Sequence, residues 1–261
     1  MKKLFSLLLV GVAMASMSSG QVRTETVEYR QGDVVLQGYL AYDASIKGKR
    51  PAVLVVHNWY GISESTRIRV DQLAALGYVA FAADIYGKGI RPADAAAASA
   101  ESGKFYKDRG LLRARTRAGL DFLSARPEAD PARLAAIGYC FGGSAVLELA
   151  RSGAPVKGTV TFHGGLSTPT PADAKNIKGK VLVLHGADDP YVKQDDVTAF
   201  MKEMREAGVD WQLVQYSGTV HSFTDKGAGS DNSTGAAYNE SSDRRSWKAM
   251  KDFFEEIFPA R

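Results

Sequence analysis

A single cysteine between a predicted strand and a predicted helix constrains the fold of this chain more than any other feature. Cys140 lies in the segment Gly-Tyr-Cys-Phe-Gly-Gly at 138–143 and is the only cysteine of the 261 residues. An apolar run at 134–137 precedes this segment, and an apolar, helix-forming run at 144–150 follows it. The pattern predicts a sharp strand–turn–helix junction with the thiol at its apex.

A Gly-x-Cys-x-Gly junction of this kind is typical of the nucleophile elbow of an α/β-hydrolase, with sulfur in the place of the commoner hydroxyl. We expect Cys140 at a positive φ, and glycines at 138 and 142 because a Cβ there would clash with the closely packed strand and helix. The thiol would lie at a helix N-terminus, whose dipole favours the thiolate form. The alternative is a buried structural cysteine beside a tight turn.

The first 20 residues have the pattern of an export signal. A basic start at 2–3 is followed by an apolar core at 4–12 and by small residues at 13–20 that offer two cleavage sites. The core is too short for a stable bilayer anchor, and no cysteine follows it that could carry a lipid. We therefore expect a signal peptide at 1–20, no stable membrane anchor after its removal, and a periplasmic or secreted protein; a retained N-terminal anchor is the alternative.

The composition indicates one globular domain at 21–261. The chain is 45% hydrophobic and 24% charged, which are ordinary values for a packed domain of this size. Loss of Lys2 and Lys3 with the signal lowers the formal net charge from +4 to +2, and both signs are interspersed. Nucleic-acid binding is therefore not predicted. A lone cysteine cannot form an internal disulfide, so a thiol kept in an oxidising compartment is expected to have a use.

Strand-like and helix-like segments alternate along most of the chain, and the first predicted strand is antiparallel. Strands are predicted at 34–40, 52–56, 78–83, 134–137, 156–162, 181–184 and 211–216, and helices at 67–76, 93–100, 111–123, 144–150, 197–206 and 246–257. This alternation predicts an α/β protein with a mostly parallel, doubly wound sheet and helices on both faces, in a single domain. A stretch rich in Gly, Ser, Asn and Asp at 226–242 is predicted to be a mobile surface loop or a flap over the site.

An acid and a histidine follow two later predicted strands, at the edge where functional groups gather in such sheets. Asp189 comes after the strand at 181–184, and His221 after the last strand. The order nucleophile, acid, histidine is that of an α/β-hydrolase triad. Asp188 competes for the acid role, but the Asp-x-x-Val spacing to Val192 favours Asp189. In such a triad the histidine accepts or shares the thiol proton, and the acid orients the histidine.

The segment His-Asn-Trp-Tyr-Gly at 57–61 follows the second predicted strand. In this fold the corresponding loop supplies one backbone N–H of the oxyanion hole, and the residue after the nucleophile supplies the other. We assign these N–H groups to Trp59 and Phe141. The aromatic side chains at 59 and 60 are also consistent with ordinary packing.

Three further histidines, His57, His163 and His185, lie at predicted strand ends. No His-x-x-x-His or paired-carboxylate spacing accompanies them, so neither a metal site nor a cofactor is predicted.

Several segments together resemble the dienelactone hydrolase (carboxymethylenebutenolidase) family, over most of the chain from residue 34 to the end. They are the elbow at 138–143, the loop at 57–61, Asp-Ile-Tyr-Gly at 84–87, Asp-Pro-Tyr-Val at 189–192 and His-Ser-Phe at 221–223. The resemblance implies a Cys140–His221–Asp189 triad that hydrolyses small esters or lactones through a thioester. It also makes Asn58, Tyr60, Lys88 and Phe223 candidates for the substrate pocket.

Three positions depart from the pattern of the best-known members of that family. Asn58 stands where those members have a glutamate that interacts with the resting cysteine. Lys88 and Asp225 stand where they have two arginines that hold a substrate carboxylate. Lysine keeps the charge but loses the planar fork, and aspartate reverses the charge, so dienelactone itself is not the expected substrate.

Three functions follow from these patterns. The favoured one is a cysteine hydrolase of a small ester or lactone. A thiol-based redox protein would use Cys140 without His221, although the chain lacks a resolving cysteine. A non-catalytic binding domain on the same fold is the third.

Overall fold

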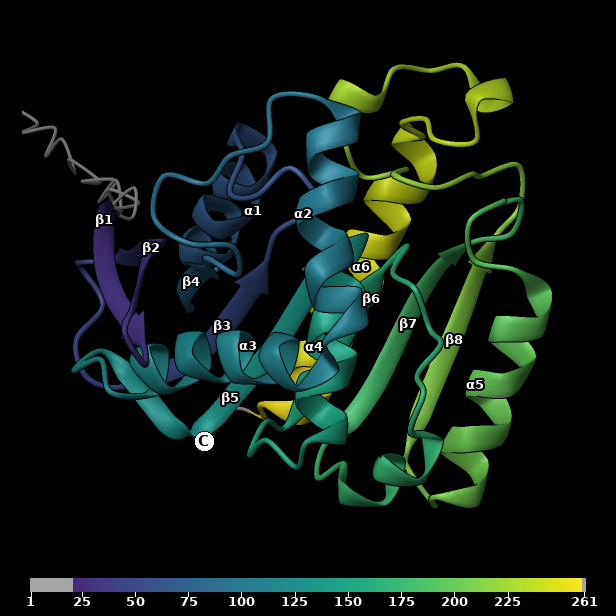
Figure 1. Cartoon of the computed structure of the whole chain (residues 1–261). Coiled ribbons are helices and arrows are strands. Elements are labelled where there is room, and N and C mark those ends of the chain that lie inside the picture. Colours follow the sequence, from purple (N-terminus) through teal and green to yellow (C-terminus); the bar gives the residue numbers. More distant parts are fainter. Residues whose placement is uncertain (1–20, 260–261) are drawn as a thin grey trace, which may run out of the picture.

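The computed structural model describes residues 21–259, which fold around one eight-stranded sheet (Figure 1). The strands are β1 (Val22–Gln31), β2 (Val34–Asp43), β3 (Arg50–Val56), β4 (Val79–Ala83), β5 (Ala129–Tyr139), β6 (Gly158–Phe162), β7 (Lys180–Gly186) and β8 (Trp211–Tyr216). The α-helices are α1 (Glu64–Ala75), α2 (Ala95–Lys107), α3 (Arg109–Ser124), α4 (Phe141–Arg151), α5 (Gln194–Glu206) and α6 (Glu240–Ile257), and the 3₁₀ helices are η1 (Pro171–Asn176), η2 (Lys226–Ala228) and η3 (Asn232–Thr234). The signal peptide expected at 1–20 lies outside the described residues.

The strand order is β1-β2-β4-β3-β5-β6-β7-β8. β1 pairs with β2 and β2 with β4 in antiparallel fashion, whereas the six strands from β4 to β8 run parallel. The mostly parallel, doubly wound sheet predicted from the sequence is therefore confirmed. Because parallel strands end at the same edge, the loops after β3, β5, β7 and β8 gather at one side of the sheet.

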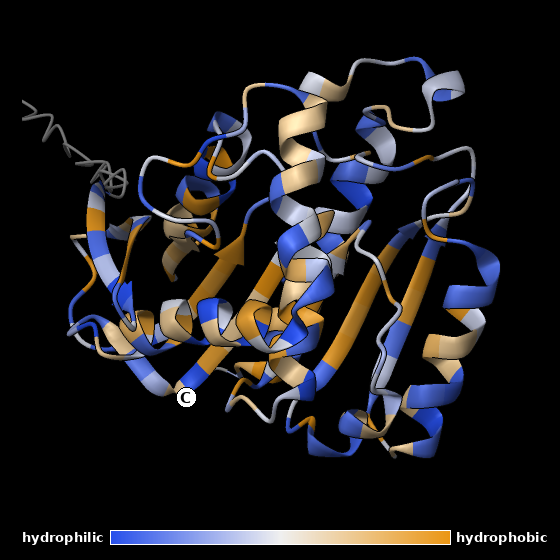
Figure 2. Cartoon of the chain, in the orientation of Figure 1, coloured by the Kyte–Doolittle hydropathy of each residue, from blue (hydrophilic) through white to orange (hydrophobic). Residues whose placement is uncertain are grey.

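Two layers of helices bury the sheet between them (Figure 1). α3 and α4 pack on one face through leucines and small apolar residues, and α1 and α6 pack on the other. Strands in the middle of the sheet are apolar on both sides; every residue of β4 and β6 is buried. Figure 2 shows these central strands in the hydrophobic colours and the outer helices in mixed ones. Such continuous apolar strands are expected where helices cover both faces.

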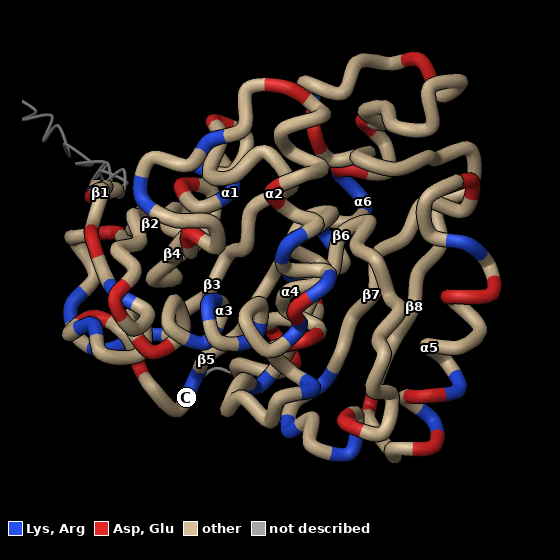
Figure 3. Tube along the Cα trace, viewed as in Figure 1, with Lys and Arg blue, Asp and Glu red and all other residues tan. Residues whose placement is uncertain are grey.

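The charged residues lie mainly on the outer helices and loops. Figure 3 shows acidic and basic positions interspersed along α5. None of the helices within residues 21–259 combines the length and the apolar character needed to cross a membrane.

Side-chain caps fix several helix starts. The carboxylate of Asp108 accepts the N–H of Leu111 at 2.8 Å at the start of α3, and Asn239 accepts the N–H of Ser242 at 3.1 Å at the start of α6. Each cap satisfies an N–H that has no partner within the helix. With this second cap, α6 begins at Glu240, six residues earlier than predicted. The last residues of the predicted 226–242 loop are therefore helical.

Candidate active site

Cys140 lies at the apex of the predicted elbow, between β5 and α4. Its φ is 55°, one of three positive values at non-glycine residues in the described chain. A Cβ on Gly138 would collide with the carbonyl of Gly142, and one on Gly142 would collide with the carbonyl of Val56. These contacts confirm the reason given for both glycines. The turn holds the sulfur above the sheet, at the first residue before α4.

His221 lies between the sulfur and a carboxylate. Its Nε2 is 3.1 Å from Sγ of Cys140, and its Nδ1 is 2.7 Å from Oδ2 of Asp189. The other carboxylate oxygen, Oδ1, accepts the N–H groups of Tyr191 and Val192 at 2.8 and 3.2 Å. These two bonds explain the Asp-x-x-Val spacing, since they aim the second oxygen at the imidazole.

Asp188, the rival acid, does not reach the histidine. It is exposed, and its backbone N–H donates to the carbonyl of Thr219. The structure therefore places Asp189, and not Asp188, beside His221.

The surroundings of His221 favour its charged form. Burial by itself would lower the pKa of the imidazole, because an imidazolium loses its hydration there. The negative charge of Cys140 and the hydrogen bonds to Asp189 and Cys140 act in the opposite direction and raise the pKa of His221 to about 10. These neighbours therefore favour the protonated imidazole.

Two other buried histidines lie behind His221 and stay neutral. His163 packs edge-on against the ring of His221, with ring centroids 5.1 Å apart, and its Nε2 is 2.8 Å from Oγ1 of Thr224. Burial, reinforced by the charge of His221, holds the pKa of His163 well below its usual value. Burial also lowers the pKa of His185. The sequence predicted that both histidines lie at strand ends, but it did not predict that they are buried next to His221.

The loop after β3 is held by a compact set of hydrogen bonds. Nδ1 of His57 donates to the carbonyl of Asn58 at 2.6 Å, and Oδ1 of Asn58 accepts the N–H of Tyr60 at 2.9 Å. The hydroxyl of Tyr86 donates to the carbonyl of Trp59 at 2.9 Å. These bonds fix the backbone around Trp59 at the edge of the same cavity that holds Cys140.

A cavity of about 600 Å³ opens over the sulfur and contains several of the predicted residues. Asn58, Trp59 and Tyr60 line it together with Cys140 and His221. Phe141 is fully buried and is not among the residues that line this cavity. Its N–H is the first of α4, where N–H groups have no helical partner.

Two aromatic lining residues escaped the sequence analysis. Tyr106 belongs to α2 and not to a loop that follows a strand. Tertiary packing brings it to the cavity, so no sequence motif indicated it. Tyr191 lies between Asp189 and Val192, and its ring packs edge-on against His221 at 5.4 Å. The acid motif itself could have pointed to Tyr191.

Two predicted pocket residues, Lys88 and Phe223, are not among the residues that line this cavity. Nζ of Lys88 lies 2.6 Å from Oε1 of Glu28 in β1. Phe223 is fully buried against His163 and Tyr216, because the turn at Ser222, with φ of 57°, directs the next side chain into the core.

The loop predicted as a surface loop or flap borders the cavity. Gly227, Ala228 and Ala236 line it, and the backbone of His221 exchanges hydrogen bonds with Gly235 and Ala237. The segment thus helps to fix the backbone of His221. Across residues 21–259, no group of three or more His, Cys, Asp or Glu side chains is arranged to hold a metal ion.

The sheet order, the elbow and the acid–histidine–thiol arrangement define an α/β-hydrolase fold. The profile of the dienelactone hydrolase family matches residues 36–258, and the chain belongs to this family.

Individual relatives agree with this assignment. The protein named usf of Aquifex pyrophilus is 31% identical over 205 residues, which are 76% of this chain and 86% of that protein. A solved structure named m3DLH has a TM-score of 0.89 and 43% identity, and the match covers 92% of this chain and all of that one. A structure described as a dienelactone hydrolase-like promiscuous phosphotriesterase from metagenomic libraries has a TM-score of 0.87 and 42% identity, with coverage of 92% and 100%.

Proposed function

We propose that this protein hydrolyses a small carboxylic ester or lactone, with Cys140 as nucleophile, His221 as acid and base, and Asp189 as the residue that orients His221. The observation that carries the proposal is the continuous chain of contacts from the thiol through the imidazole to a buried carboxylate. A redox protein has no need of this arrangement, and a binding domain gains nothing from a strained cysteine at φ 55°.

In the first half of the reaction the thiolate of Cys140 attacks the carbonyl carbon. The C–S bond forms, and the carbonyl electrons move to the oxygen, which accepts the N–H groups of Trp59 and Phe141. When the carbonyl re-forms, the C–O bond to the leaving group breaks, and the imidazolium of His221 protonates the departing oxygen. An ester loses its alcohol at this step, whereas the new hydroxyl of a lactone stays attached to the acyl group.

In the second half His221 takes a proton from water, and the hydroxide attacks the thioester. The C–S bond breaks, the carboxylic acid leaves, and the thiolate returns to its resting pair with the imidazolium. Asp189 stabilises the imidazolium in both halves without itself becoming protonated.

A second candidate reaction is the hydrolysis of phosphotriesters. It is favoured by the description of the metagenomic structure at 42% identity as a promiscuous phosphotriesterase. In that reaction an S–P bond would form at Cys140 while the P–O bond to the leaving aryloxide breaks, and water would then cleave the S–P bond. Parallel assays of an aryl acetate and an aryl dialkyl phosphate, each with the Cys140→Ala variant, test whether one nucleophile serves both.

We also propose that the chain is exported and that residues 1–20 are removed. Support comes from the basic start, the short apolar core and the small residues that follow it. N-terminal sequencing of the mature protein from the periplasmic or culture fraction tests this; an intact Met1 in the cytoplasmic fraction contradicts it.

Turnover of p-nitrophenyl acetate, with and without prior treatment by iodoacetamide, separates the candidate functions. A cysteine hydrolase releases p-nitrophenol catalytically and loses this activity on alkylation. A thiol redox protein consumes peroxide instead, and a binding domain does neither.

A further inference from the structure

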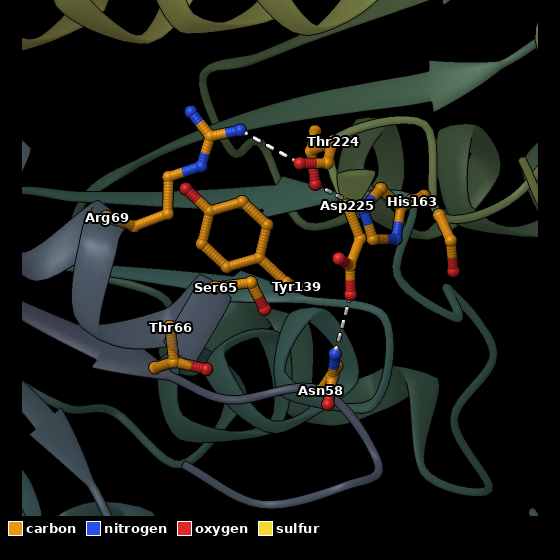
Figure 4. Close-up of a pocket in the computed structure, with 9 residues that line it drawn as sticks. Asn58, Ser65, Thr66, Arg69, Tyr139, His163, Thr224 and Asp225 are labelled. Atoms are coloured by element: carbon orange, nitrogen blue, oxygen red, sulfur yellow. Dashed lines mark hydrogen bonds between the residues drawn. The ribbon is translucent and has the colours of Figure 1, made fainter. Parts of the chain in front are cut away.

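The carboxylate of Asp225 lines the cavity that contains Cys140 and His221. Its Oδ2 accepts a hydrogen bond from Nδ2 of Asn58 at 3.3 Å, and its Oδ1 accepts the N–H of Gly227 at 2.9 Å. Figure 4 shows the Asn58 and Asp225 side chains pointing toward one another. Because both oxygens are held, the negative charge has a fixed place in the wall of the cavity.

No lysine or arginine is among the described residues that line this cavity. The nearby cations face other partners: Lys88 pairs with Glu28, and Arg91 lies against Asp84 and the carbonyl of Ile90.

Two more cationic side chains, Arg69 and Lys226, line the neighbouring pockets. Arg69 donates to Asp243 at 2.6 Å and to the carbonyl of Thr224 at 2.9 Å, and Nζ of Lys226 lies over the ring of Tyr238. Figure 4 shows the guanidinium of Arg69 directed at Thr224. Asp225 also borders these two pockets, but within residues 21–259 no ion pair joins its carboxylate to Arg69 or Lys226.

The remaining wall suits a cation as well. Trp59, Tyr60 and Tyr191 line the cavity, and aromatic rings attract substituted ammonium groups. A fourth lining ring, Tyr106, already has the guanidinium of Arg109 over one face, 4.9 Å from the ring centroid. Apart from Cys140 and His221, Asp225 carries the only carboxylate or basic side chain among the described residues that line the cavity. A substrate carboxylate would meet repulsion here without a compensating cation.

We propose that Asp225 sets the charge specificity of this site, which accepts esters that carry a cationic group and disfavours those that carry a carboxylate. The proposal deepens the hydrolase function and rests on it. The ammonium group would lie between the carboxylate of Asp225 and the aromatic wall, while the ester carbonyl lies at Cys140.

The test compares three p-nitrophenyl esters that share a leaving group and differ in acyl charge: trimethylammonio-butyrate, its uncharged tert-butyl isostere, and glutarate. We expect the cationic ester to exceed the anionic one in kcat/KM by roughly 10- to 30-fold, the effect of one partly screened charge a few ångströms away. Asp225→Asn should bring this ratio close to one, and Asp225→Arg should invert it. Asp188→Asn, which removes an exposed carboxylate outside the cavity, should preserve the ratio.

A wild-type ratio near one, or a ratio unchanged by Asp225→Asn, overturns the proposal. If the Asp225 variants do not fold, the salt dependence of the wild type decides. Added salt must lower kcat/KM for the cationic ester and raise it for the anionic one, and a salt-independent ratio overturns the proposal. Failure of the proposed hydrolase function is distinguishable from failure of the charge specificity. In the former case the uncharged isostere would not be cleaved, or the Cys140→Ala variant would cleave it equally well.

Discussion

Nε2 of His221 lies 3.1 Å from Sγ of Cys140, although the two residues are 81 positions apart in the chain. Cys140 follows β5 and His221 follows β8, and β6 and β7 separate these strands in the sheet. The loop after β8 crosses that distance, and its bridge to Ala236 and the 226–239 segment holds the imidazole in place. The contact thus depends on the whole parallel half of the sheet.

We expect Cys140→Ser to hydrolyse esters far more slowly than the wild type, by roughly 10²- to 10⁴-fold in kcat. A hydroxyl holds its proton much more tightly than a thiol, so His221 can no longer maintain a standing anion. Stopped-flow release of p-nitrophenol measures the effect, with circular dichroism as the control for folding. A serine variant with the wild-type rate would show that the site does not depend on sulfur.

We expect Asp189→Asn to reduce kcat by roughly 10³- to 10⁴-fold, as loss of the orienting acid does in other triads. The amide cannot stabilise the imidazolium of His221, and it can present an N–H where the carboxylate accepts a hydrogen bond. Asp188→Asn is the matched control and should change kcat only slightly, since that side chain is exposed. The reverse order of the two effects would contradict the assignment of the acid.

Asn58 provides a test of the resting charge state. Cys140 lies at the N-terminus of α4 with Nε2 of His221 3.1 Å from its sulfur, and both neighbours favour a thiolate–imidazolium pair. Iodoacetamide should therefore alkylate Cys140 rapidly well below the pH of about 8.5 at which a free thiol ionises. Asn58→Glu should slow this alkylation at neutral pH, because a second carboxylate beside Asp225 repels the thiolate and competes for His221. Asn58→Gln controls for side-chain length. A pH profile like that of free cysteine, identical in all three proteins, would contradict the predicted ion pair.

His57 should make the protein less stable in mild acid. Burial lowers the pKa of His57 to about 4, and the neutral ring donates through Nδ1 to Asn58 and accepts the N–H of Ile85 at Nε2. Below a pH of about 6.5 the unfolded chain binds a proton that the folded chain excludes, so stability falls as pH falls toward 4. We expect this residue to cost about 2 kcal/mol between pH 7 and pH 5.

Urea unfolding at both pH values measures this loss, with His57→Gln as the comparison. Glutamine keeps one donor and one acceptor without titrating, so the variant should show a smaller difference between pH 7 and pH 5 than the wild type. Equal acid sensitivity in both proteins would show that His57 is not the group responsible.

The sequence predicted the parallel part of the fold because its strands are continuous apolar runs between clear helices. It missed β1, whose residues are mostly polar and largely exposed at the sheet edge. The ion pair of Lys88 could not be predicted for the same reason, since its partner Glu28 belongs to β1. An edge strand paired on one side carries little of the apolar pattern by which strands are recognised.

The contacts of His221 with Cys140 and Asp189 were predictable because each of these residues follows a strand end within a short motif, and the Asp-x-x-Val spacing separated Asp189 from Asp188. The cavity wall was less predictable. Tyr106 reaches it from α2 through tertiary packing, and Phe223 leaves it because of a single positive φ at Ser222. Neither effect leaves a mark in local sequence.

The most direct test of the central claim is to look for the acyl group on Cys140. The protein is mixed with excess p-nitrophenyl acetate, quenched in acid within the first turnovers, and analysed by intact-mass and peptide mass spectrometry. We predict one added acetyl group on the peptide that contains Cys140, labile to hydroxylamine as a thioester should be, and neither adduct nor turnover in Cys140→Ala. Undiminished turnover in the alanine variant, with no acetyl group on the wild-type cysteine, would contradict the account.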